Sequence, residues 1–136
     1  MAPSVVDEVL VDGVEIDVSV TERAAVVRVV GDVAAVDVAG VRERLLAACA
    51  LAPEPRVVVL DLTRVALLSA HGARVVTRFV GACARGQVRV CLVVAVDGIA
   101  HRVLRIAGVS ERVPTFPSVA KAEEVIERSL AALSRP

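Results

Sequence analysis

The chain has 136 residues, of which 56% are hydrophobic, and its 16 basic and 16 acidic residues give a formal net charge of +0. This length suits one domain with a real core, and the neutral balance argues against recruitment of nucleic acid or an anionic membrane by a global field. Only 1% of the residues are aromatic, which argues against single-stranded nucleic-acid binding because that usually needs aromatic stacking platforms.

No targeting or membrane-spanning pattern is evident in the chain. The N-terminus lacks the basic start and apolar segment of a secretory signal, and charges interrupt each apolar run well before membrane-spanning length. We therefore expect a cytoplasmic protein without membrane contacts. The expected organisation is a flexible segment at residues 1–13, one domain at 14–133 and a frayed end at 134–136.

The three cysteines, Cys49, Cys83 and Cys91, lack the spacing of a metal site. An odd number of cysteines without such spacing favours buried thiols in a reducing compartment. Cys83 and Cys91 could lie near each other across a turn at Gly86, but we expect all three thiols to be free.

The domain begins with two predicted strands. Residues 14–20 and 24–30 are rich in β-branched residues, and the polar segment 21–23 between them predicts a hairpin. Gly31 and Asp32 are expected to close the second strand.

A helix and a buried strand follow the hairpin. Apolar residues at helical spacing predict a helix over 37–51, which Pro53 and Pro55 end. The nearly continuous apolar run 56–62 predicts a strand buried on both faces, because a half-exposed strand would alternate apolar and polar residues.

The next helix is predicted over 70–85. Ser69 directly precedes it and can cap it by accepting a hydrogen bond from a backbone N–H. Gly86 ends the helix, and residues 88–96 predict the following strand. The side chains expected on its inner stripe are Ala73, Val76, Thr77, Val80 and Ala84.

Two further helices are predicted around a short edge strand. Asp97 is expected to cap the first helix, which ends at Gly108, and residues 113–116 predict the edge strand. Ser118 is expected to cap the final helix. The inner faces are predicted at Ile99, Val103 and Ile106 in the first helix and at Ala122, Val125, Ile126, Ser129, Leu130 and Leu133 in the second.

This order of elements predicts one α/β domain. Strand–helix–strand repeats imply parallel central strands, and the initial hairpin makes the sheet mixed. We expect four or five strands with about four helices packed against them.

The segment from Asp61 to Ala73 joins an apolar strand to a helix through Leu68-Ser69-Ala70-His71-Gly72. It resembles the centre of the STAS domain family of bacterial anti-sigma factor antagonists. Gly31-Asp32-Val33, Leu104-Arg105-Ile106-Ala107-Gly108-Val109 and Phe116-Pro117-Ser118 resemble further family segments in the same order. The resemblance covers about residues 14–133 and implies the same fold.

The resemblance also implies a regulatory site. In that family the central run ends in Asp-Ser-Ser-Gly, and a partner kinase phosphorylates the Ser before the Gly. The corresponding residues here are Ser69, Ala70, His71 and Gly72, so His71 stands at the phospho-acceptor position without a hydroxyl.

The residues around this position predict an interaction surface. Arg74 and Arg78 follow His71 at helical spacing, so the three can share the outer face of the helix and suit a carboxylate- or phosphate-bearing partner. The same pattern also fits an ordinary solvated helix face. The resemblance favours partner contact and extends the expected surface to Asp32 and to Ala34, which stands where family members often carry Asp.

The sequence gives little support for catalysis. Asp61, Ser69 and His71 include the residue types of nucleophilic catalysis, but no oxyanion donor or second base is evident. No glycine-rich phosphate loop, His/Cys metal cluster or paired-carboxylate motif is present. We therefore predict no catalytic residue, no cofactor, no metal and no enzymatic activity.

The resemblance implies an anti-sigma factor antagonist, which binds an anti-sigma factor of the ATPase or kinase type and so frees a sigma factor for transcription. Without the usual Ser, such a protein would be constitutive or regulated differently. The alternative is a small-ligand sensor or accessory module that binds a nucleotide or another anion beside His71, Arg74 and Arg78. The sequence leaves the oligomeric state open.

Overall fold

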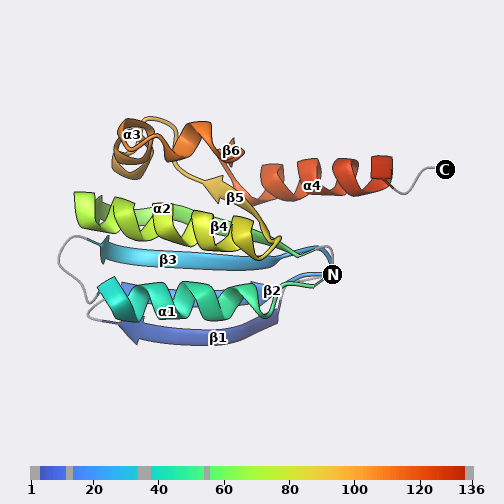
Figure 1. The fold of residues 1–136 in the computed structure, drawn as a ribbon, viewed down its shortest axis with the longest axis horizontal. Helices are drawn as coiled ribbons and strands as arrows, with labels where there is room; N and C mark the ends of the chain where they lie inside the picture. Colours follow the sequence, from blue (N-terminus) through green and yellow to red (C-terminus); the bar gives the residue numbers. More distant parts are fainter. Residues whose placement is uncertain (1–3, 12–13, 34–37, 54–55, 134–136) are drawn as a thin grey trace.

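The computed structural model describes residues 4–11, 14–33, 38–53 and 56–133 (Figure 1). Within these ranges, six strands form one sheet in the order β1-β2-β3-β4-β5-β6, together with four α-helices and one short 3-10 helix. The elements are β1 (Ser4–Val11), β2 (Val14–Val20), β3 (Ala25–Val33), α1 (Val38–Cys49), β4 (Val57–Leu68), α2 (Ala70–Arg85), β5 (Arg89–Val93), α3 (Ile99–Ile106), η1 (Val109–Glu111), β6 (Thr115–Phe116) and α4 (Val119–Leu133).

The sheet is mixed, as the sequence predicts. β1, β2 and β3 pair antiparallel, whereas β3, β4, β5 and β6 pair parallel. The predicted turn between β2 and β3 is confirmed, because the backbone N–H of Thr21 donates to the carbonyl of Ala24 over 2.9 Å. The predicted class, an α/β domain with about four helices, is therefore confirmed.

Both faces of the sheet carry an apolar layer, and β4 contributes to each. Val58 and Leu60 belong to the larger cluster, which includes α1, α2 and α3, whereas Val57 and Val59 belong to a smaller cluster with Ala122 and Ile126 of α4. Figure 1 shows α1 and α2 side by side along the sheet and α4 beyond β5 and β6. The double cover explains the continuous apolar run at the start of β4.

The sheet has one strand more than the sequence analysis expected. Residues 4–11 lie within the segment predicted to be flexible, but they form β1 and pair with β2 along most of its length. Only residues 12–13 separate β1 from β2, so the two strands pair locally as a hairpin. The strand β1 was not predicted because its sequence lacks a strong alternation of apolar and polar residues. Residues 1–3, 12–13 and 134–136 lie outside the described residues, and so does Pro55.

β3 and β4 continue beyond their predicted ends. β3 runs through Gly31 to Val33, and β4 continues from the predicted end at Leu62 to Leu68, since the two strands remain paired to their last residues. Thr63 and Arg64 of β4 are polar and exposed. These two residues are the reason why the sequence predicted the end of the strand before them. Conversely β5 is shorter than predicted and ends at Val93.

Two predicted helix faces need correction. In α2, Ala84 is exposed, and the buried face includes Val75, Phe79 and Cys83 because this helix packs against α1 as well as the sheet. In α3 the predicted inner residues Ile99 and Ile106 are 49% and 87% exposed, whereas Ala100 and Leu104 are buried. Asp97 is not the cap of α3, since Gly98 is the N-cap and no side chain bonds there.

Most of the other predicted helix positions that are described are confirmed, but Ser129 of α4 is exposed and does not lie on the buried face. Val41, Leu45 and Ala48 of α1 are buried, and Ser118 caps α4 by accepting from the Lys121 N–H over 3.1 Å. In α4, Ala122 and Ile126 are buried, Val125 is half-buried and Ser129 is exposed, while the side chains of Leu130 and Leu133 lie outside the described residues.

All three cysteines are free and buried, as predicted. The neighbouring pair differs from the expected one, because the Sγ atoms of Cys49 and Cys83 lie 3.0 Å apart where α1 packs against α2. The hydrogen bond to Cys49 and burial raise the pKa of Cys83, and the hydrogen bond from Cys83 lowers the pKa of Cys49. Burial raises the pKa of Cys91 in β5.

Candidate functional site

The candidate site is the start of α2, where the ends of β3 and β4 meet. Ser69 accepts a hydrogen bond from the Gly72 N–H over 3.1 Å, which confirms it as the N-cap of α2. Its own N–H and hydroxyl both donate to the carbonyl of Val33, each over 3.3 Å. Ser69 therefore caps the helix and ties its start to the last residue of β3.

Gly72 lies in the first turn of α2 at a point of very close packing. A Cβ at this position would lie 2.6 Å from the Val33 carbonyl oxygen and 2.7 Å from the Leu68 Cδ1. The first of these contacts is with backbone, which cannot rotate away. The helix can approach the ends of β3 and β4 this closely only with glycine at position 72.

The outer face of α2 carries the predicted cations. His71, Arg74 and Arg78 are exposed and share this face, as their spacing predicts, and Ala70 is exposed beside them. In the described residues, neither arginine forms a salt bridge through its guanidinium. Two unpaired positive charges and an exposed imidazole therefore face solvent at the start of α2.

A groove runs between this face of α2 and α3. Its cavity volume is about 450 Å³, and Arg74 and Arg78 line one side while Val103 and Ile106 line the other. The remaining lining residues are Ala70, Ala73, Thr77 and Ala107. One partner bound in this groove would therefore contact both arginine and apolar side chains.

Large apolar side chains are exposed on α3, on β4 and in the segment before α3, and one of them, Ile106, lines this groove. Ile106 is 87% exposed, Val96 69%, Ile99 49% and Leu67 47%. The sequence analysis did not predict the exposure of Ile99 and Ile106, because it assigned both residues to the buried face of α3. The available signal was that α3 is apolar on two faces, at Ala100 and Leu104 as well as at the isoleucines, although a short helix can bury only one.

The two predicted positions outside α2 have different outcomes. Asp32 is exposed near the end of β3 and pairs in register with Leu67 of β4, so it lies at the same edge as the start of α2. Ala34 lies outside the described residues.

Asp61 is buried in the middle of β4 and has structural partners. Its carboxylate accepts from the Thr63 hydroxyl over 2.7 Å, from the Thr63 N–H over 3.0 Å and from Arg28 Nε over 3.3 Å. In the described part of the chain no hydrogen bond joins it to Ser69 or His71. The three residue types of a catalytic triad are therefore present without the hydrogen bonds that a triad requires.

The described residues contain no group of three or more His, Cys, Asp or Glu side chains placed to hold a metal ion. Among the helices described, none combines the length and apolar character needed to cross a membrane.

Comparison with known proteins identifies the family. The family model of the STAS domain matches residues 15–122, which include the whole of the site described above. The chain belongs to the STAS domain family. This confirms the resemblance on which the predicted site rests.

One solved structure supports the same fold. The crystal structure of an anti-sigma factor antagonist from Mycobacterium paratuberculosis matches this STAS domain with a TM-score of 0.71 and 19% sequence identity. The match covers 84% of this chain and 94% of that chain. A comparison with curated proteins finds no match.

Proposed function

We propose that this STAS domain is an anti-sigma factor antagonist acting in the cytoplasm. It binds an ATPase- or kinase-type anti-sigma factor and so frees a sigma factor, without catalysing a reaction or contacting nucleic acid. The observation that carries the proposal is the exposed α2–α3 surface, defined by His71, Arg74, Arg78, Ile99 and Ile106, beside a tightly packed helix start.

This surface has the composition of a protein interface. Arginine and large apolar residues are enriched where proteins bind each other, and exposed apolar side chains lower the free energy when a partner covers them. The side chain of Ile106 is 87% exposed, so it adds little hydrophobic stabilisation to the isolated domain. A partner with an apolar ridge and nearby carboxylates fits the groove between α2 and α3.

The proposed regulation differs from that of family members with Ser before the Gly. Phosphorylation adds about −1.5 to −2 charge, which can block docking by repulsion. His71 occupies the position of that Ser in the motif and has no hydroxyl to accept a phosphoryl group. The protein therefore acts as a constitutive antagonist or takes another input.

Binding to an ATPase-type anti-sigma factor from the same genome tests this proposal by calorimetry. Ile106→Asp and Arg74→Glu are expected to weaken binding about tenfold or more, because each puts a negative charge into the surface. Arg42→Glu reverses the charge of an exposed residue on α1 and serves as the matched control. Equal affinities for all four proteins would refute the α2–α3 surface as the docking site.

A second function is favoured by the groove itself. Its volume of about 450 Å³ and its two arginines suit a nucleotide or another small anion, which would make this domain a ligand-sensing module. A thermal-shift series with nucleotides tests this reading. A rise in melting temperature that Arg78→Gln abolishes would favour it, and an unchanged melting temperature with every nucleotide would reject it.

A further inference from the structure

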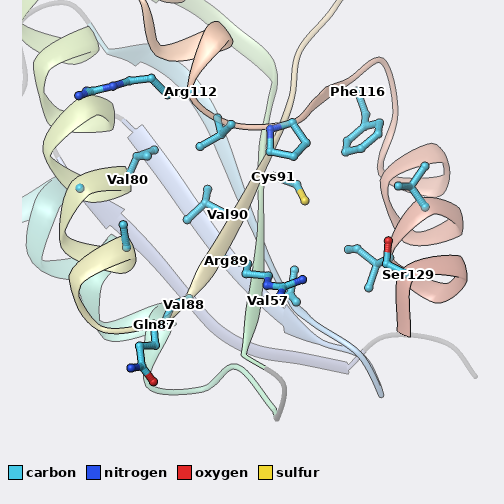
Figure 2. A pocket seen from close by; sticks show the side chains of 16 residues that line it. Val57, Val80, Gln87, Val88, Arg89, Val90, Cys91, Arg112, Phe116 and Ser129 are labelled. Atoms are coloured by element: carbon cyan, nitrogen blue, oxygen red, sulfur yellow. The ribbon is translucent and has the colours of Figure 1, made fainter. Parts of the chain in front are cut away.

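A second and larger groove lies at the edge of the sheet, with α2 on one side and α4 on the other (Figure 2). Its volume is about 820 Å³, which is within the range of small-molecule sites, about 300–1,000 Å³. It uses Gly81 and Ala84 of α2, so it is separate from the groove beside Arg74 and Arg78. Its apolar lining consists mainly of Val57, Val80, Val88, Val90, Phe116 and Ile126.

The groove exists because the edge of β5 is only partly covered. β6 is two residues long, and it pairs with β5 only at Leu92 and Val93. Val90 lies two residues before Leu92 and pairs with Val58 of β4 on one side. On the side that faces β6, no strand in the described part of the chain pairs with Val90. Side chains from both faces of the sheet therefore reach one open space.

The charge around this space has one sign. Arg89 and Arg112 line the groove, and none of the other described residues that line it is charged. Both arginines are exposed, and within the described ranges neither guanidinium has a hydrogen-bond or salt-bridge partner. In Figure 2, Arg89 extends past Val57 toward α4, whereas Arg112 extends toward α2. A ligand that fills this groove therefore meets positive charge, with no competing carboxylate among the lining residues that the structure describes.

The size of the open edge decides between two kinds of occupant. An added peptide strand would gain its affinity from main-chain hydrogen bonds along β5. The uncovered part of β5 runs only from Arg89 to Cys91, which is about 10 Å at 3.3 Å per residue. That length allows very few main-chain bonds. An apolar molecule with one anionic group makes better use of the groove's volume and charge.

We propose that this groove binds a medium-chain fatty acid. The acyl chain lies against Val57, Phe116 and Ile126 between β5 and α4, and the carboxylate pairs with the guanidinium of Arg89. Such a pair is charge-assisted and forms beside an apolar surface that excludes water, which strengthens it. Arg112 contributes positive potential from the α2 side without touching the carboxylate. The site is independent of the α2–α3 surface.

Titration of the full chain with dodecanoate, below the concentration at which it forms micelles, tests the proposal by backbone amide NMR. Saturable shifts are expected for Val90, Cys91 and the facing residues of α2 and α4, with dodecanol binding at least about tenfold more weakly. Equal binding of dodecanol would contradict carboxylate recognition. Tighter binding of dodecyl phosphate would contradict the assigned head group, and absence of saturable shifts, or shifts confined to the α2–α3 groove, would refute the site.

Three variants in the groove and one control on α1 locate the ligand. Arg89→Gln is expected to reduce dodecanoate affinity about tenfold or more and Arg112→Gln less, while Arg42→Gln on α1 has no effect. Gly81→Leu is expected to block binding by filling the groove. A Cβ at this position meets only Arg85 Nη1, at 3.5 Å, so no backbone atom obstructs the start of the new side chain. Unchanged affinity of folded Arg89→Gln, or of folded Gly81→Leu, would overturn the assignment.

Discussion

Gly72 and Cys91 show how single residues limit what this domain tolerates. Gly72 has no room for a side chain because the Val33 carbonyl and Leu68 approach the first turn of α2. Cys91 is a thiol buried in the apolar cluster beneath α4, and this burial raises its pKa. Both features follow from close packing of helices against the sheet, and each leads to a measurable prediction.

Gly72→Ala should destabilise the domain by about 1–3 kcal/mol, because the new Cβ would lie 2.6 Å from a backbone oxygen and the helix must move. Gly81→Ala in the same helix is the matched control, since its Cβ meets only a flexible arginine tip at 3.5 Å. The control should be neutral or more stable by up to about 1 kcal/mol. Urea unfolding measures both, and equal stabilities of the two variants would contradict the packing described at Gly72.

Cys91 should make the stability of the domain fall at alkaline pH. Burial raises its pKa above the unfolded value of 9.0, so the unfolded chain loses the proton first. The stabilising contribution is complete below pH 9.0 and is lost as the pH rises through the higher folded pKa. Urea unfolding can be measured from about pH 7 to about pH 11, a range that spans the titration of thiols. The loss of unfolding free energy at alkaline pH should be smaller for Cys91→Ala than for the wild type. Parallel curves would contradict this role for Cys91.

At the scale of elements, α1 and α2 meet at the pair of thiols. The Sγ atoms of Cys49 and Cys83 are 3.0 Å apart, so a small movement of either side chain would bring them to bonding distance. The sequence suggested Cys83 and Cys91 instead, because it shows neighbours along the chain and not the packing of one helix on another.

Diamide oxidation of the folded protein should therefore join Cys49 to Cys83 within one chain and leave Cys91 as the thiol that is alkylated after unfolding. Each bridge consumes two thiols and reduces one diamide to its hydrazine. Peptide mapping without reductant identifies the bridge, and Cys91→Ala should still form it whereas Cys49→Ala should not. A bridge that contains Cys91, or covalent dimers as the main product, would contradict the observed contact.

Secondary structure was predictable where one local signal dominates. The period and the cap of α2 give its limits, and Ser69 and Gly86 are visible in the sequence. The buried face of α3 was not predictable, because this eight-residue helix carries apolar side chains on two faces. Only its packing against the rest of the domain decides that Leu104 is buried. The same limit hid the groove beside Arg89, which depends on the short length of β6.

Across the whole domain, the candidate site combines the STAS fold with an exposed imidazole at the start of α2. Ser69 and Gly72 hold the start of α2 against β3, and His71 is exposed between them. The sequence predicted a site at His71 through its resemblance to the family motif, whereas the exposed apolar side chains on α3 were found only in the fold. We propose that this surface binds an anti-sigma factor and that phosphorylation does not release it.

The most direct measurement is the affinity for an ATPase-type anti-sigma factor before and after incubation with Mg·ATP, for the wild type and for His71→Ser. This exposed position should change stability by no more than about 0.5 kcal/mol. The wild type should bind equally well before and after and gain no acid-stable phosphate, whereas His71→Ser should be phosphorylated and then bind more weakly. Phosphorylation of the wild type at Ser69, Thr63 or His71 with loss of binding would contradict the claim, as would the failure of both proteins to bind.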